Sequence, residues 1–476
     1  MENNKAMKAG IGYTIGNILI KGINFLTLPL FSRLMSPSEF GVFNLFISYD
    51  AIISILISLA MHTSLRNAKY KFENKIDNYI SSISILYFIN SLILLFLILI
   101  FRNSISNITG FNLPVLILLI VNGFGSAIFS LYNAKLSLEY SYKKYLILAG
   151  LNSIGNIILS LLLITTVFNY DKSIGRITGV SAVIFILSIS ILYMQYKKSK
   201  PVFNKEYWKF SLSYSLPLVP HGISQTLLSQ FDKMMIASLV NNVATGIYSL
   251  ASNVRLIYTV IIDSISNVWW TWFYEQMNDK LNNKEEKLQK GAIALSLLFM
   301  IPTIGGLALS REIILILGGK EYIDASYLVV PMVVDAFVVF LYTLVVSSEY
   351  YLKKTFYVSL GTLIAAIINC ITNVIFIKMF GYIAAAYTTL FSYLIYLIIH
   401  IIISRRLIKF YILPLKYIII ELVILFGIGA VCIIYNSNLI IRVILLLITE
   451  SIAIYYLFKK NKSLISDFIN RNKRSE

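Results

Sequence analysis

Charged side chains within long apolar runs are the residues of this sequence best placed to do chemistry. Lys21 lies in an apolar run over about residues 11–34, and Asp50 lies in the next run, over about residues 40–62. If each run crosses a bilayer as a helix, both charges are about ten residues, or 15 Å, from a membrane face. That distance exceeds the reach of a lysine that extends its ammonium group to the interface. A charge at this depth is costly unless it is paired or faces a wet cavity, so both residues are predicted to be functional.

Later runs carry further charges that could bind an ion or form pairs. Arg255 stays ionised and its planar fork suits phosphate oxygens, so we expect it to contact an anion, with a structural pair to Asp50 or Asp263 as the alternative. Asp50 itself could form such a pair, with Lys21 or Arg255, or could exchange a proton or another cation. Asp232 and Lys233 are adjacent, so their side chains diverge by about 100° and are expected to make separate stabilising contacts. Four residues are therefore ion-pair or coupling candidates: Asp50, Asp263, Asp232 and Lys233.

The sequence lacks the residue clusters that metal or redox chemistry needs. Its two cysteines, Cys370 and Cys432, both lie inside apolar runs, and the three histidines, His62, His221 and His400, are isolated from them. These spacings argue against a disulfide framework and against a zinc or haem site. We therefore expect no cofactor, no metal and no enzymatic activity.

Composition places the chain in a membrane. Of its 476 residues, 58% are hydrophobic and only 13% are charged, which is too apolar for one soluble domain and too long for one or two anchors. The formal net charge of +18 comes from short basic clusters between the apolar runs. Nucleic-acid binding is therefore a poorer explanation than the excess of lysine and arginine typical of cytoplasmic loops.

Hydropathy predicts an all-α polytopic protein with about fourteen transmembrane helices. Proline at positions 29, 217 and 220 should break or kink some of these helices. After the first two runs, twelve more follow near residues 78–101, 111–132, 145–168, 175–196, 211–240, 246–270, 291–310, 325–348, 356–377, 381–403, 414–435 and 439–458.

The distribution of basic residues orients these helices. With the N-terminus in the cytoplasm, thirty of the 41 lysines and arginines fall in inner segments, eight fall in outer segments and three lie within spans. One missed span would exchange the inner and outer segments in the rest of the chain, and the basic segments after that point would then lie outside. The positive-inside rule therefore favours an even number of spans, with both termini in the cytoplasm.

A weak internal repeat divides the chain. A shift of 205 residues lays residues 29–50 over residues 234–255, matches Gly41 with Gly246 and places Asp50 on Arg255. Two opposite charges at equivalent depths could face each other across a pseudo-twofold axis. We predict an N-terminal lobe over 1–200, a C-terminal lobe over 201–404, and two appended helices with a basic tail over 405–476.

Three stretches resemble a known family. PLFSRLMSPSEFG, which starts at residue 29, is similar to the opening of bacterial lipid-linked oligosaccharide flippases of the multidrug/oligosaccharidyl-lipid/polysaccharide exporter superfamily, the translocases of O-antigen and capsule repeat units. Residues 231–255 and 380–396 resemble the same family, so the resemblance covers essentially the whole chain. It implies two pseudo-symmetric six-helix lobes around a central cationic cavity, with two appended helices.

The resemblance also implies a substrate, an undecaprenyl-pyrophosphate-linked oligosaccharide, moved by alternating access for surface polysaccharide synthesis. The basic residues of family members that contact the anionic head match Lys21 and Arg255 here. The second helix departs from that pattern, since Asp50 stands where a cation is expected. Further implied partners are the lipid bilayer, a coupling cation, either proton or sodium, and other polysaccharide-assembly proteins.

Two other functions remain open at this stage. A drug or metabolite exporter of the same superfamily would need ion-binding acids clustered in one lobe, whereas the acids here are scattered. A membrane enzyme of polysaccharide assembly would need a long outer loop or a catalytic histidine or serine site, and neither is visible in the sequence. A flippase is therefore the favoured prediction.

Overall fold

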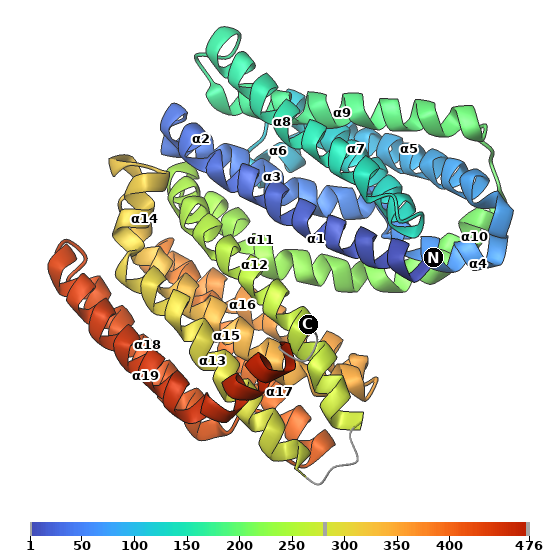
Figure 1. Ribbon diagram of the computed structural model, residues 1–476. Coiled ribbons are helices and arrows are strands. Elements are labelled where there is room, and N and C mark those ends of the chain that lie inside the picture. Colours follow the sequence, from blue (N-terminus) through green and yellow to red (C-terminus); the bar gives the residue numbers. More distant parts are fainter. Residues whose placement is uncertain (1, 279–282, 473–476) are drawn as a thin grey trace. The chain divides into compact units, whose positions relative to one another are not determined.

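The computed structural model describes residues 2–278 and 283–472, and every regular element in these ranges is a helix. The chain divides into two compact units, residues 1–246 and 247–476. Figure 1 labels the helices, and each unit is described by itself.

In the first unit, α7 lies at the centre and packs against α3, α5 and α9. α8 packs on α9, and α1 packs on α8, along the helices drawn from blue to green in Figure 1. The helices are α1 (Glu2–Leu26), α2 (Leu28–Leu34), α3 (Pro37–Ser58), η1 (Met61–Ser64), α4 (Leu65–Phe72), η2 (Glu73–Lys75), α5 (Ile76–Ile100), α6 (Arg102–Thr109), α7 (Leu113–Leu138), α8 (Tyr142–Thr166), α9 (Lys172–Lys198), α10 (Lys205–Ser215), η3 (Leu216–Leu218) and α11 (Val219–Leu239).

In the second unit, α15 is the central helix, and it packs against α13, α16, α17 and α18. Most of its side chains are buried. The last two helices, α18 and α19, run side by side and pack on α13 (Figure 1). The helices are α12 (Asn242–Asn278), which begins in the first unit, α13 (Lys284–Ala308), α14 (Ser310–Leu317), η4 (Lys320–Tyr322), α15 (Ala325–Tyr351), α16 (Thr355–Phe380), α17 (Ile383–Ile408), α18 (Leu415–Ile434) and α19 (Leu439–Asn472).

The predicted class, an all-α protein that crosses the membrane many times, is confirmed. Within the described residues, 12 segments are long and apolar enough to span a membrane. The expected count of fourteen is not confirmed, because the seventh and fourteenth expected spans, α11 and α19, are not among the twelve. α11 carries Asp232 and Lys233, which lower its mean hydropathy, and side chains of α19 are described only as far as residue 455.

Local sequence explains where several helices begin. In the stretch PLFSRLMSPSEFG, the Ser36 Oγ accepts a hydrogen bond from the Glu39 amide at 3.3 Å, and the Glu39 carboxylate accepts one from the Ser36 amide at 2.8 Å. This capping box, with Pro37 at the first helical position, starts α3. The expected break at Pro217 and Pro220 is also observed, as the 3₁₀ turn η3 between α10 and α11.

Helix α12 is one continuous helix of 37 residues, and it extends beyond the expected span of 246–270 at both ends. Arg255 and Asp263 do not interrupt it, since a charged side chain leaves the backbone hydrogen bonds intact, whereas a proline removes one. The division between the compact units falls inside this helix, after Gly246. The lobe boundaries expected after residues 200 and 404 stay predictions.

Candidate functional site

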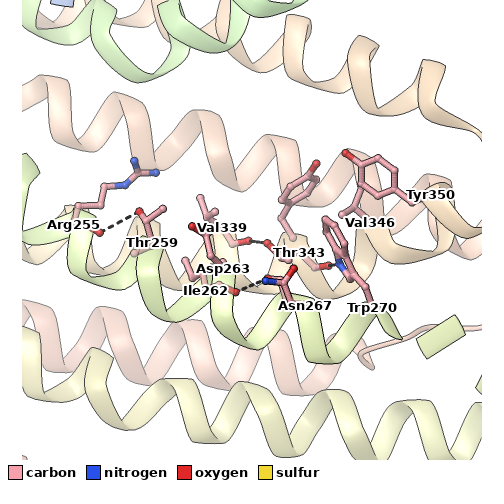
Figure 2. Close-up of a pocket in the computed structure, with 13 residues that line it drawn as sticks. Arg255, Thr259, Ile262, Asp263, Asn267, Trp270, Val339, Thr343, Val346 and Tyr350 are labelled. Carbon is pink, nitrogen blue, oxygen red and sulfur yellow. Dashed lines mark hydrogen bonds between the residues drawn. The ribbon is translucent and has the colours of Figure 1, made fainter. Parts of the chain in front are cut away.

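A cavity of about 520 Å³ lies between α12 and α15 in the second unit (Figure 2). It contains the predicted residues Arg255 and Asp263. The side chains that line it are Arg255, Thr259, Ile262, Asp263, Ser266, Asn267, Trp270, Ala336, Val339, Tyr342, Thr343, Val346 and Tyr350.

The spacing of these residues places them on one face of each helix. Along α12 the lining positions recur every three or four residues, as a single helical face requires. On α12 the side chains that line the cavity are mostly polar, and they form a polar row along the helix. The lining side chains of α15 are either aliphatic or carry a hydroxyl group. A polar row on a membrane-spanning helix is costly against lipid, so a row that lines a cavity indicates contact with a polar substrate or with water.

Arg255 lies at one end of this row (Figure 2), and a carboxylate of the second unit balances its charge. Its Nε is 2.5 Å from Oδ2 of Asp335, a residue of α15 whose side chain is only 1% exposed. The guanidinium carbon also lies 5.3 Å from the centre of the Tyr393 ring of α17. The Arg255 side chain is 25% exposed, so it remains accessible to an anion that enters the cavity.

The other end of the row is aromatic. The Trp270 Nε1 donates a hydrogen bond to the Thr343 carbonyl at 3.3 Å, and the rings of Trp270 and Tyr350 lie 5.4 Å apart. Asp263 and Asn267 are exposed side chains on the same helical face, between Arg255 and Trp270 (Figure 2). Carboxylate, amide and hydroxyl groups beside aromatic rings can bind the hydroxyls and the apolar face of a sugar.

The other predicted residues belong to the first unit. Lys21 is an exposed residue of α1. Asp50, on α3, accepts a 3.5 Å hydrogen bond at Oδ2 from Ser126 of α7, while its Oδ1 has no hydrogen-bond partner among the described residues. The pairing of Asp50 with Arg255, which belongs to the other unit, stays a prediction.

Asp232 and Lys233 lie on α11 in different surroundings. Asp232 is 5% exposed, whereas the Lys233 Nζ donates a hydrogen bond to the Gln230 Oε1 at 3.3 Å. The same Gln230 oxygen accepts a bond from Ser48 of α3 at 3.1 Å, so Lys233 belongs to a polar contact between α11 and α3. These contacts are compatible with the separate stabilising roles expected for the two residues.

Sequence reasoning missed two of the cavity residues and the partner of Arg255. Asp335 is an acid within an apolar run, but nothing in the sequence identified its partner. Asn267 and Trp270 could have been found, because they lie four and seven residues after Asp263 and so return to the same helical face.

Known proteins resemble this chain in sequence and in fold. A Haloferax volcanii protein described as "Probable low-salt glycan biosynthesis flippase Agl15" is 23% identical over 397 residues, which cover 83% of this chain and 82% of that protein. The lipid II flippase MurJ, in an inward closed conformation, has a TM-score of 0.75 and 16% identity, covering 96% of this chain and 100% of MurJ.

A multidrug transporter of the MATE family, in an inward-facing conformation, has a TM-score of 0.65 and 13% identity over 83% of this chain and 94% of its own. At such identities the likeness to both solved structures concerns the fold alone. The sequence profile described as "Polysaccharide biosynthesis protein" matches residues 7–276. That match extends over more than half of the sequence, and the chain therefore belongs to the polysaccharide biosynthesis protein family.

Proposed function

We propose that this protein is a flippase that moves lipid-linked glycan precursors across a membrane by alternating access. The observation that carries the proposal is the polar row on α12, a membrane-spanning helix. This row lines a cavity in a member of the polysaccharide biosynthesis protein family. A transporter needs such a polar path to carry sugars past the hydrocarbon. The name of the Haloferax volcanii relative supports the same function.

The proposed substrate is an undecaprenyl-pyrophosphate-linked oligosaccharide repeat unit of a capsule or O-antigen. It would cross the bacterial cytoplasmic membrane, in which the protein has both termini on the cytoplasmic side. The protein acts as a transporter and forms no covalent intermediate. The proposed partners also include a coupling cation and other polysaccharide-assembly proteins. The candidate ligands or ion pairs for the cation are Asp50, Asp263, Asp232 and Lys233.

Arg255 is proposed to bind the pyrophosphate. A guanidinium has five N–H donors, which is more than the Asp335 carboxylate can accept, so Arg255 can bind an anion without losing its buried partner. Lys21 is proposed as a second cation for the same head group. The sugars are expected to contact Asp263, Asn267 and Trp270 at the other end of the row, while the polyprenyl chain stays in lipid.

Charge and fork geometry at Arg255 can be tested separately. Arg255→Lys keeps the charge but loses the bidentate fork, whereas Arg255→Gln loses both. Lipid-linked repeat units should accumulate on the inner leaflet of spheroplasts that express Arg255→Gln, with Arg255→Lys intermediate. Lys21→Ala should also reduce transfer. The matched control is Arg102→Gln, because Arg102 is an exposed arginine at the start of α6.

Two results would contradict different parts of the proposal. Normal outward transfer in both Lys21→Ala and Arg255→Gln would remove the site assignment and leave the transporter class intact. No movement of lipid-linked oligosaccharide by the wild-type protein in proteoliposomes, together with export of cationic dyes, would instead favour a drug exporter.

A further inference from the structure

A carboxylate and an imidazole face each other in a fully buried part of the second unit. Glu349 of α15 and His400 of α17 are both 0% exposed, and Oε1 of the glutamate lies 2.7 Å from Nδ1 of the histidine. Next to them, the Ser348 hydroxyl of α15 bonds to the Ser404 hydroxyl of α17 at 2.8 Å. The pair therefore lies inside the close contact between these two helices.

Each partner also presents a polar atom that is not satisfied. The Glu349 Oε2 and the His400 Nε2 have no hydrogen-bond partner among the residues that the structure describes. Nε2 points at Gly361 of α16, where an added Cβ would overlap it. Buried polar atoms without partners are costly, so such an arrangement is expected where it serves a function.

In the part of the chain that the structure describes, the groups that face the pair are neutral. The titratable groups that face it are Tyr342 and Tyr350 of α15 and Tyr396 of α17, and the rings of Tyr342 and Tyr396 lie 5.0 and 4.6 Å from the His400 ring. α16 contributes Gly361 and Thr362, and Trp270 of α12 lies against Tyr350. α18 packs against α15, but its carboxylate, Glu421, accepts a hydrogen bond from Ser296 of α13 at 2.7 Å. Among the described residues, no lysine or arginine lies within ion-pair distance of Glu349.

This setting favours one particular protonation state. With one proton between them, Glu349 and His400 together are neutral, as an ion pair or as two uncharged groups. Without that proton they carry a net negative charge in a dry interior, which no cation balances. The sealed pair should therefore retain the proton and release it when water reaches the site. The proton belongs to the pair rather than to either residue.

Hydroxyl-bearing side chains that pack against the pair extend to the cavity. The Tyr396 OH bonds to the Tyr342 OH at 2.8 Å, and Thr362 lies 3.0 Å from the Tyr396 oxygen. Tyr342 lines the cavity, as does Tyr350, the residue after Glu349. A change in the occupancy or hydration of the cavity would thus act directly on residues that enclose the pair.

We propose that Glu349 and His400 form a proton-binding site that couples transport to a proton gradient. The pair takes one proton from water while the cavity is open and retains it when the site is sealed. It returns the proton to water after the cavity opens on the opposite side of the membrane, so each cycle moves one proton down its gradient and the number of protons on the protein is restored. This inference rests on the proposed transport function, and it identifies the proton as the coupling cation.

The first test measures protonation without transport. The melting temperature of the detergent-solubilised wild type should change with pH between about pH 5 and pH 8, where a histidine can titrate. That dependence should be lost in Glu349→Gln/His400→Gln. His400→Gln alone removes the imidazole, and it provides the same comparison if the double variant does not fold. His221→Gln is the matched control. If the variants differ from the wild type in melting temperature by the same amount at every pH, the pair is purely structural and the proposal is overturned.

The second test uses proteoliposomes with an undecaprenyl-pyrophosphate-linked oligosaccharide and an imposed pH gradient. The gradient should accelerate transfer by the wild type and by His221→Gln, whereas transfer by Glu349→Gln should no longer respond to it. A response that persists in Glu349→Gln would overturn the coupling role. If the wild type moves no lipid at any pH, the proposed flippase function fails, but the melting experiment still decides whether the pair binds a proton.

Discussion

Arg255 and Asp335 show how one residue pair can serve both stability and binding. The arginine is ionised at every relevant pH, and its carboxylate partner is 1% exposed. Removing one partner of such a pair leaves an uncompensated charge in a poorly solvated place, whereas removing both leaves none. The pair is therefore expected to be strongly coupled in its effect on the free energy of unfolding.

A double-mutant cycle measures that coupling. Arg255→Gln should destabilise the protein by about 3 kcal/mol, because it strands the buried Asp335 carboxylate. Asp335→Asn should cost less, since the Arg255 side chain is 25% exposed and water can solvate it. The double variant should lose less stability than the sum of the two single losses. Thermal unfolding in detergent measures each loss. Additive losses would show that the two residues act independently.

At the scale of elements, polar contacts attach the last two helices to the rest of the second unit. Arg442 of α19 is 1% exposed and donates to both carboxylate oxygens of Glu312 of α14, at 2.6 and 2.7 Å. It also donates to the Ala308 carbonyl at the end of α13, at 2.5 Å. Asn436, between α18 and α19, donates to the Ser326 hydroxyl of α15 at 2.9 Å.

This attachment should weaken in acid. Burial raises the pKa of Glu312, but the hydrogen bonds and charge of Arg442 outweigh it and leave the pKa below the usual range. A depressed pKa contributes stability above the unfolded value of about 4.3, and that contribution is lost as the pH falls through the folded value. Acidification below about pH 4 should therefore lower the melting temperature more in the wild type than in Glu312→Gln, which lacks this group. Identical acid dependence would contradict the assignment.

Element boundaries followed from the sequence where backbone chemistry decides them. Pro217 and Pro220 break their helix, as expected, because proline removes a backbone donor. The capping box at Ser36 was not predicted, and it starts α3 at Pro37 rather than near residue 40. Arg255 and Asp263 lower the hydropathy of the run around them, yet α12 is continuous there. Hydropathy reports solvent preference rather than backbone hydrogen bonding, which explains that difference and also the omission of α11 from the apolar spans.

For the whole molecule, the sequence identified the class and family but only part of the site. Arg255 and Asp263 were identified because a charge in an apolar run is visible without any structure. The partner of Arg255 and the pairing of Glu349 with His400 were not identified. Those contacts depend on which helices are neighbours and on how each is rotated about its axis, and the periodicity of a single helix contains neither.

The predicted orientation in the membrane is testable by labelling. A cysteine introduced at Asn283, exposed before α13, should be protected from an impermeant thiol reagent in intact cells, whereas one at Ser104 of α6 should react. The wild type, whose cysteines are Cys370 and Cys432, is the control. Labelling at Asn283 in intact cells would invert the assigned orientation.

The distribution of tryptophan in this fold also has an optical consequence. Of the four tryptophans, three lie near the end of α12, and Trp270 is part of the cavity wall, while Trp208 lies on α10 and donates to the Ser82 carbonyl at 3.0 Å. In Trp208→Phe, all indole fluorescence would come from α12. Addition of a pyrophosphate-linked oligosaccharide should then shift the emission spectrum, and the further change Trp270→Phe should greatly reduce the shift. An unchanged spectrum at saturating ligand would indicate that the sugars bind elsewhere, so the protein contains its own fluorescent reporter of the proposed site.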